Sequence, residues 1–301
     1  MALEAFRQIL TMIILLMVGM LCYKIGFIDE ATNKKLSKIL LLLVSPVVIF
    51  LSYQRPFDTE LLHGLLIAFG LSAFSYAIAL AVAHLIYRSK NGESIPIEKY
   101  ACVYSNCGFI GIPLVYGVFG SEGVFYLTAF ISMFNLLVWT HGIIVMSGNR
   151  SFAFFKKALV SPALIGVYLG FIFFIARIIL PEVLLSPMRI LGDTQTPLAM
   201  LIAGAAIAGT NLGRALKRVS LYKVCAIRLL LIPGLFILAA RFLGLPDVIV
   251  GTVAIVTACP VAANIVLFAN MYEKDYLYAS ELMAASTLLC MGTIPLMLML
   301  L

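Results

Sequence analysis

The stretch Asn106-Cys-Gly-Phe-Ile-Gly-Ile-Pro-Leu-Val-Tyr-Gly-Val-Phe-Gly120 interrupts a long apolar segment near its centre. The surrounding run, from about Tyr100 to Phe119, is long enough to cross a bilayer. Pro113 has no backbone N–H to donate, and Gly108 and Gly111 weaken the preceding turn, so a continuous helix is disfavoured. Because unpaired backbone groups are very costly in hydrocarbon, we expect the break to line a cavity or to be buried by other helices.

A second break is predicted far downstream, in Thr257-Ala-Cys-Pro-Val-Ala-Ala-Asn264, where Pro260 again falls in the middle of an apolar span. Two interrupted spans at matching places in two halves of a chain are typical of secondary transporters built from inverted repeats.

The composition is that of a polytopic membrane protein. Of the 301 residues, 63% are hydrophobic and only 12% are charged, about half the usual share for a soluble domain. The first apolar run, Ile9 to Cys22, lacks a polar leader and a cleavage site, so we interpret it as the first span and not as a signal peptide. The six cysteines form no CxxC pair and suggest neither disulfides nor a metal site.

Ten membrane spans are predicted, with short loops and no soluble domain. They lie at about residues 5–23, 35–53, 61–87, 99–118, 123–147, 157–180, 189–210, 220–243, 247–270 and 276–300. Fifteen Lys and Arg residues fall in the loops on one side and five on the other. The positive-inside rule therefore predicts a cell-membrane protein with both termini outside, and it explains the net charge of +7 without a nucleic-acid partner.

The two halves, 1–150 and 151–301, correspond in sequence. Pro46 and Pro197 are 151 residues apart, and Pro113 and Pro260 are 147 apart. With five spans in each half, the second half enters the membrane in the opposite orientation, which predicts an all-α inverted repeat. The alternative is that prolines, which are frequent in membrane proteins, align by chance.

Several stretches resemble the auxin efflux carrier family, which includes plant auxin exporters and many bacterial permeases. They are Ser105-Asn-Cys-Gly-Phe-Ile-Gly-Ile-Pro-Leu114, Phe119-Gly-Ser-Glu-Gly123, Val44-Ser-Pro-Val-Val-Ile-Phe50, Thr196-Pro-Leu-Ala-Met200 and Ala279-Ser-Glu-Leu-Met-Ala-Ala-Ser-Thr-Leu-Leu289. The resemblance implies an antiporter-like fold in which spans four and nine unwind and cross at their prolines. It also implies a scaffold of spans 1, 2, 6 and 7, a mobile domain of spans 3–5 and 8–10, and an anionic substrate, usually a carboxylate, held at the crossing.

A half-helix that begins at a break presents free N–H groups and the positive end of its dipole, which suits a carboxylate. The predicted binding surface is therefore largely backbone, and it comprises Ile112, Pro113 and Leu114 in the first half and Pro260, Val261 and Ala262 in the second. Neither span carries a Lys or Arg near its break.

Three polar side chains are candidates for substrate contact. Asn106 matches the family's substrate-contacting asparagine, although its side chain can instead cap the broken helix. Asn264 is the corresponding residue of the second half, and Ser161 falls where plant members of the family carry a polar residue.

Ionisable residues inside a membrane mark function by default, and they identify candidates for ion coupling. His141 and Glu281 lie inside spans, but both can also be explained as residues at the membrane interface. Asn135 could supply an oxygen ligand to Na⁺. Arg228, inside span eight, is a further intramembrane charge. The driving ion stays open between Na⁺, H⁺ and exchange.

We therefore predict a secondary transporter of small organic carboxylates, such as malate or malonate or an auxin-like acid, that works by alternating access. The expected partners are the anion, the lipid bilayer and a second copy of the chain, with no cofactor or metal. The alternative is a ligand sensor or channel on the same fold. An intramembrane enzyme is disfavoured, because the sequence lacks HExxH, Gly-x-Gly-Asp and a Ser/His/Asp set within its spans.

Overall fold

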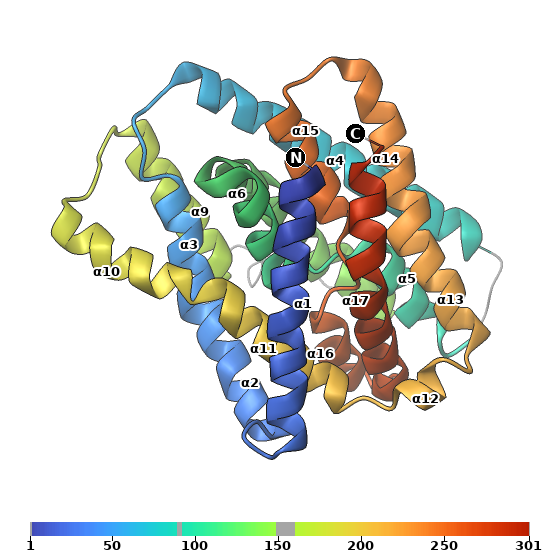
Figure 1. Ribbon diagram of the computed structural model, residues 1–301. Helices are drawn as coiled ribbons and strands as arrows, with labels where there is room; N and C mark the ends of the chain where they lie inside the picture. The colour runs from blue at the N-terminus through green and yellow to red at the C-terminus, as the bar shows by residue number, and fades with distance from the viewer. Residues whose placement is uncertain (1, 89–91, 149–159, 301) are drawn as a thin grey trace.

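The computed structural model describes residues 2–88, 92–148 and 160–300, and across them the chain is helical (Figure 1). Its helical segments are α1 (Ala2–Lys24), α2 (Glu30–Ile39), η1 (Leu40–Val44), α3 (Ser45–Ser52), α4 (Thr59–Ile86), α5 (Ile95–Val103), η2 (Cys107–Gly111), α6 (Ile112–Leu137), η3 (Val138–Gly142), α7 (Ile143–Ser147), α9 (Pro162–Ile175), α10 (Glu182–Asp193), α11 (Gln195–Ala208), α12 (Leu212–Ala215), α13 (Val219–Ala226), η5 (Ile227–Leu231), α14 (Ile232–Ala240), η6 (Arg241–Leu243), α15 (Asp247–Ala258), α16 (Asn264–Met271) and α17 (Tyr276–Leu298).

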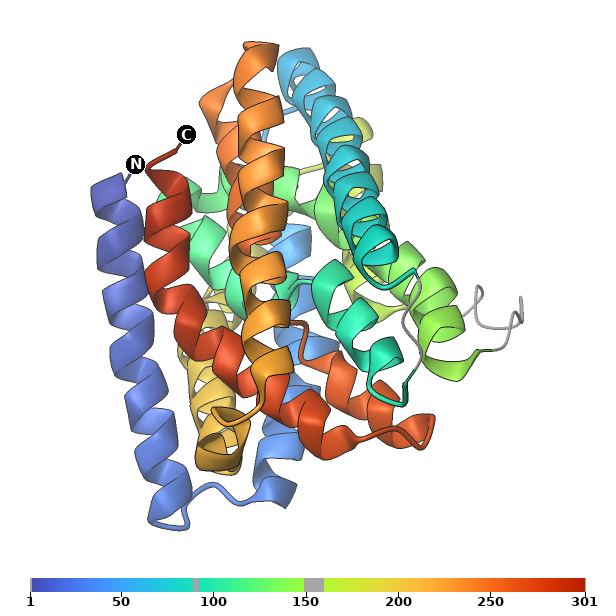
Figure 2. The same cartoon turned by 90° about the vertical axis from the view of Figure 1, so that its right-hand side faces the viewer.

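Seven of the described helical stretches are long and apolar enough to cross a membrane, so the chain is a multi-span membrane protein. They are Arg7–Lys24, Glu30–Ser52, Thr59–Ile86, Cys107–Ser147, Glu182–Ala208, Val219–Leu243 and Tyr276–Leu298. Two shorter apolar helices, α9 and α15, accompany them. Figure 2 shows that α1, α4, α17 and the α13–α14 segment run along much of the molecule, whereas α5 and α16 are much shorter.

The difference between seven long helices and ten predicted spans has local causes. The predicted fourth span is divided at residues 104–106, and the ninth is divided between α15 and α16. The stretch Cys107–Ser147 kinks at Gly120, whose φ of 61° and ψ of −152° suit glycine. The start of the sixth span and the boundary at residue 150 lie outside the described residues.

Four helices pack in two close pairs, α1 with α11 and α3 with α9. A Cβ added at Gly204 of α11 would lie 2.1 Å from the Leu16 carbonyl oxygen of α1. A Cβ added at Gly166 of α9 would lie 2.7 Å from the Pro46 carbonyl oxygen of α3. Small residues at such contacts let backbones approach closely, which drives helix association where no hydrophobic effect operates.

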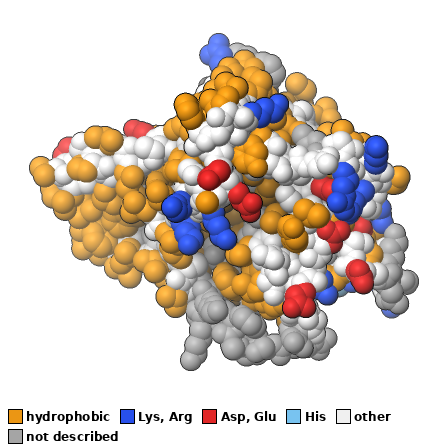
Figure 3. Space-filling model, turned by 90° about the horizontal axis from the view of Figure 1, so that it is seen from below, with side chains coloured by type: hydrophobic (Ala, Val, Ile, Leu, Met, Phe, Trp, Pro, Cys, Tyr) orange, Lys and Arg blue, Asp and Glu red, His pale blue; other side chains and the backbone are white. Residues whose placement is uncertain are grey.

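Charged side chains gather at the end of the molecule opposite the termini (Figure 1, Figure 3). Both termini lie at one end, beside each other in Figure 1. The opposite end carries several groups of Lys and Arg side chains, interspersed with acidic ones (Figure 3). Four of the fifteen basic residues predicted for that side, Lys90, Arg150, Lys156 and Lys157, are not among the described residues.

Candidate functional site

The two breaks lie side by side and are joined by backbone hydrogen bonds. The Asn106 N–H donates to the Pro260 carbonyl at 2.8 Å, and the Ala262 N–H donates to the Tyr104 carbonyl at 3.0 Å. These bonds form an isolated antiparallel bridge between Ser105 and Val261. Segments more than 150 residues apart in sequence thus satisfy each other's backbone groups where helices end, as the absence of water in a membrane requires.

The first break lies upstream of the predicted position. The chain leaves helical geometry at Tyr104, whose φ is −100° and ψ is 117°, and re-enters it after Asn106. Pro113 instead falls in the first turn of α6, where a missing N–H is tolerated. The sequence predicted that Ile112, Pro113 and Leu114 form the exposed amide end of a half-helix. This prediction is wrong, because the three residues lie inside a helix.

Asn106 is the N-cap of the helix that follows the first break. Its Oδ1 accepts a hydrogen bond from the Phe109 N–H at 3.2 Å, which is the standard role of asparagine at this position. Its Nδ2 amide has no hydrogen-bond partner among the described residues, although the residue is only 6% exposed. Capping thus uses the acceptor of this side chain and leaves its donor for another group.

Open space lies beside this N-cap, at Gly108. Gly108 is only half-buried, and a Cβ added to it would meet nothing within 4 Å. Its carbonyl accepts a hydrogen bond from Gln195 Nε2 at 3.3 Å, and Gln195 Oε1 in turn accepts one from the Ser45 hydroxyl at 3.1 Å. Gln195 and Ser45, from α11 and α3, were not predicted from the sequence, because only the fold brings them to the break.

At the second break, neighbouring side chains contact the backbone of Val261 and the side chain of Asn264, whose Nδ2, like that of Asn106, has no hydrogen-bond partner among the described residues. The Val261 N–H donates to Ser286 Oγ of α17 at 3.1 Å. Asn264 begins α16, and its Oδ1 accepts a hydrogen bond from the Tyr100 hydroxyl at 2.9 Å. Pro260, Val261 and Ala262 are buried, so the predicted residues of the second half come together at the break but are largely enclosed.

Arg228 contacts the helix ends at both breaks. Its guanidinium donates to the carbonyls of Cys259 at 3.1 Å, Cys102 at 3.2 Å and Val103 at 3.3 Å, and also to that of Thr257. The side chain is 1% exposed. One arginine thus satisfies carbonyls at the C-terminal ends of α5 and α15, which lack helical partners.

Comparison with known proteins identifies the family. The sequence profile described as "membrane transport protein" matches the chain twice, at residues 4–153 and 150–298. The chain belongs to this family. The predicted resemblance to the auxin efflux carriers is thereby confirmed.

Two curated relatives of this membrane transport protein family are archaeal. An uncharacterized transporter of Methanothermobacter thermautotrophicus is 26% identical over 175 residues, which is 56% of this chain and 56% of that protein, so the chain spans about half the length of this relative. An uncharacterized transporter of Methanocaldococcus jannaschii is 23% identical over 292 residues, or 93% of both chains. Family and relatives are transporters.

Two of the predicted coupling residues have local partners in this member of the family. His141, in η3, lies 2.9 Å through Nδ1 from the hydroxyl of Tyr104, so it borders the first break. Asn135 donates to the Ile131 carbonyl of its own helix at 2.9 Å. His141 therefore contacts Tyr104 at the first break, whereas Asn135 is bonded within its helix.

Glu281 and Ser161 also have partners that favour structural roles. Glu281 is buried and pairs with Arg214 Nε at 3.3 Å and Arg218 Nε at 3.2 Å, which hold its charge in place. Ser161 caps α9 by accepting a hydrogen bond from the Leu164 N–H at 3.4 Å. The described residues contain no cluster of three or more His, Cys, Asp or Glu suited to a metal ion.

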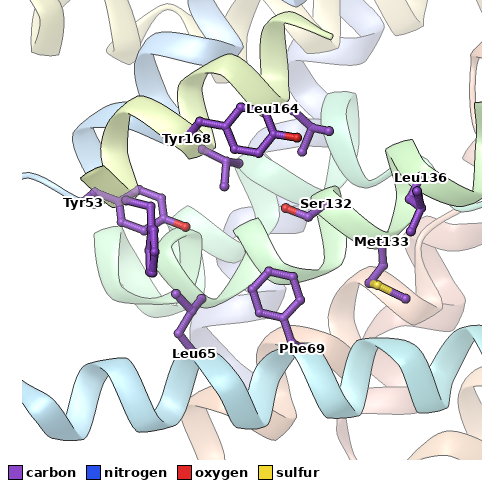
Figure 4. Close-up of a pocket in the computed structure, with 10 residues that line it drawn as sticks. Tyr53, Leu65, Phe69, Ser132, Met133, Leu136, Leu164 and Tyr168 are labelled. Atoms are coloured by element: carbon purple, nitrogen blue, oxygen red, sulfur yellow. The ribbon is translucent and has the colours of Figure 1, made fainter. Parts of the chain in front are cut away.

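A cavity of about 340 Å³ lies between α9 and Tyr53, which follows α3, on one side and α4 and α6 on the other. Figure 4 shows that its lining is mainly apolar, with the hydroxyls of Tyr53, Ser132 and Tyr168 as polar side-chain groups. The lining residues are Tyr53, Leu65, Phe69, Ser132, Met133, Leu136, Leu164, Val167, Tyr168 and Phe171. This lining includes no residue of either break, so the cavity offers apolar space without charge recognition.

Proposed function

We propose that the protein is a secondary transporter of small organic carboxylate anions, which are held beside the first break. The observation that carries this proposal is the free Nδ2 amide of Asn106, next to the open space at Gly108. The positive end of the helix dipole adds to these donors, because η2 begins there and continues into α6. A carboxylate would accept from the Asn106 amide and from the Gly108 N–H, because the N–H groups of Cys107, Phe109, Ile110 and Gly111 already have acceptors.

The fold that we propose is a ten-span inverted repeat of residues 1–150 and 151–301, with the fourth and ninth spans crossing at their breaks. Three observations support it. The breaks form an antiparallel bridge. The pair α1–α11 joins spans one and seven, and the pair α3–α9 joins spans two and six, so each contact corresponds to the other when the halves are exchanged. The family profile matches each half. The basic end of Figure 3 supports a cytoplasmic face there and termini outside the cell membrane.

Alternating access follows from this arrangement. Spans 1, 2, 6 and 7 form the scaffold, and the remaining spans carry the crossing segments as a mobile domain. The contact of Gln195 with Gly108 joins scaffold to crossing in the present conformation and must break for the domain to move. The apolar cavity lies between helices of the two domains, where relative movement needs space.

The substrate that we propose is a malate- or malonate-like dicarboxylate, with an auxin-like aromatic acid as the second choice. The chain works as a homodimer in the bilayer. Energy comes from Na⁺, from H⁺ or from exchange, and His141 is the coupling candidate with a contact to the crossing segments.

Uptake of labelled carboxylates by the purified protein in proteoliposomes tests this function. We expect uptake in the wild type that stops when the ion gradients are collapsed. We expect Asn106→Ala to reduce uptake at least about tenfold, or about 1.4 kcal/mol, while the protein still inserts. Binding without flux would identify a sensor instead, and wild-type uptake by the variant would contradict the assignment of Asn106.

A further inference from the structure

Arg228 contributes a buried positive charge at the crossing. It belongs to η5, a π-helical turn in the middle of the Val219–Leu243 stretch, and such turns are frequent at functional sites. Among the described residues, no Asp or Glu forms an ion pair with it. Its hydrogen bonds all go to backbone carbonyls.

The four carbonyls that Arg228 contacts converge from two helix ends. Cys102 and Val103 end α5, and Thr257 and Cys259 lie at the end of α15. Each helix end carries a partial negative charge from its dipole. In transporters with broken helices, unwound carbonyls and half-helix C-terminal ends are the groups that coordinate Na⁺ or H⁺.

The guanidinium therefore has the surroundings that a coupling cation would have. Its planar fork of five N–H donors can serve several carbonyls at once, and it stays charged at any physiological pH. A buried charge without a partner is very costly, so the converging dipoles must supply the compensation. A Na⁺ ion cannot occupy the same carbonyl oxygens while the guanidinium is present.

We propose that Arg228 is a positioning residue that takes the place of a soluble cation at the crossing, so that anion binding by this chain requires no Na⁺ there. Its fixed charge also offsets that of the bound anion. The proposal deepens the transport function proposed above and rests on it for its meaning, but its test uses the unfolding temperature as well as binding.

The experiment is cation rescue of Arg228→Ala in detergent, with choline chloride as the background salt. Four carbonyls lose their partner, so we expect the unfolding midpoint to fall by roughly 5–10 °C. Guanidinium at non-denaturing millimolar concentration should raise this midpoint, whereas urea, which has a similar shape without the charge, should not. Wild-type protein should melt at the same temperature in sodium chloride and in choline chloride.

Two further variants keep the test decisive if Arg228→Ala does not fold. Arg228→Lys keeps the charge, and Arg228→Gln keeps N–H donors without it. We expect Na⁺ to stabilise Arg228→Gln but not Arg228→Lys, and wild-type malonate affinity to be the same in Na⁺ and in choline. Wild-type binding or stability that depends on Na⁺, or variants that respond equally to guanidinium and urea, would overturn the proposal. If Asn106→Ala binds carboxylates as tightly as the wild type, the proposed function is rejected instead.

Discussion

The two breaks are similar in topology but differ in how their polar groups are used. Asn106 and Asn264 each accept a hydrogen bond through Oδ1, and neither Nδ2 has a partner among the described residues, but at the first break Asn106 lies next to the open space at Gly108. At the second, Ser286 accepts from the Val261 N–H, and Tyr100 donates to Asn264. This difference is the reason that we propose the first break as the anion site, and it predicts that the second break mainly stabilises the fold.

The strongest way to break this comparison is to fill the opening at the first break. The Cβ of Gly108→Leu would have nothing within 4 Å, so we expect the fold to tolerate this substitution. We expect carboxylate affinity to fall at least about tenfold, or about 1.4 kcal/mol. Binding calorimetry and a thermal unfolding scan on the same preparation measure the two effects separately.

The matched control for this variant is Gly292→Leu in α17. That glycine also has nothing within 4 Å of an added Cβ, but it is exposed and lies away from both breaks in sequence. We expect its carboxylate affinity to equal that of the wild type. Equal losses in the two variants, or none in Gly108→Leu, would contradict the placement of the anion.

A smaller effect is expected from Ser286→Ala at the second break. The buried Val261 N–H loses its acceptor, which should lower the free energy of unfolding by about 1–3 kcal/mol. Anion affinity should hardly change, because this break holds the crossing and does not contact the ligand. Ser72→Ala is the control, since that buried hydroxyl bonds only to the Ala68 carbonyl of its own helix. A large loss of anion affinity in Ser286→Ala would contradict the proposed difference between the two breaks.

The sequence predicted the existence of both breaks but misplaced the first. Proline and glycine within an apolar run are reliable signs that a helix is disturbed. They do not say where, because proline is well tolerated in the first turn of a helix, and Pro113 occupies that place in α6. For Asn106, the structure shows the helix cap that the sequence offered as the alternative to substrate contact, since asparagine favours helix N-caps, and substrate contact stays a prediction.

Contacts between distant segments could not be predicted in the same way. Arg228 was recognised as an intramembrane charge, but its four carbonyl partners belong to segments that only the fold brings together. Gln195 lies at the start of α11 with no local signal that it reaches Gly108. Glu281 looked like a free carboxylate inside a span, but it forms ion pairs with Arg214 and Arg218, which the sequence did not predict.

The most direct test of the account compares Asn106→Asp with Asn264→Asp in carboxylate binding at neutral pH. Both substitutions keep the oxygen that accepts the hydrogen bond from Phe109 N–H or from the Tyr100 hydroxyl. Both replace an amide donor without a partner among the described residues by a negative charge, but only Asn106 lies beside the open space at Gly108 where we place the anion, so we expect the affinity of Asn106→Asp to fall about 100-fold or more. Asn264→Asp should retain most of the wild-type affinity. Equal affinities in the two variants, or the larger loss in Asn264→Asp, would contradict an anion site at the first break.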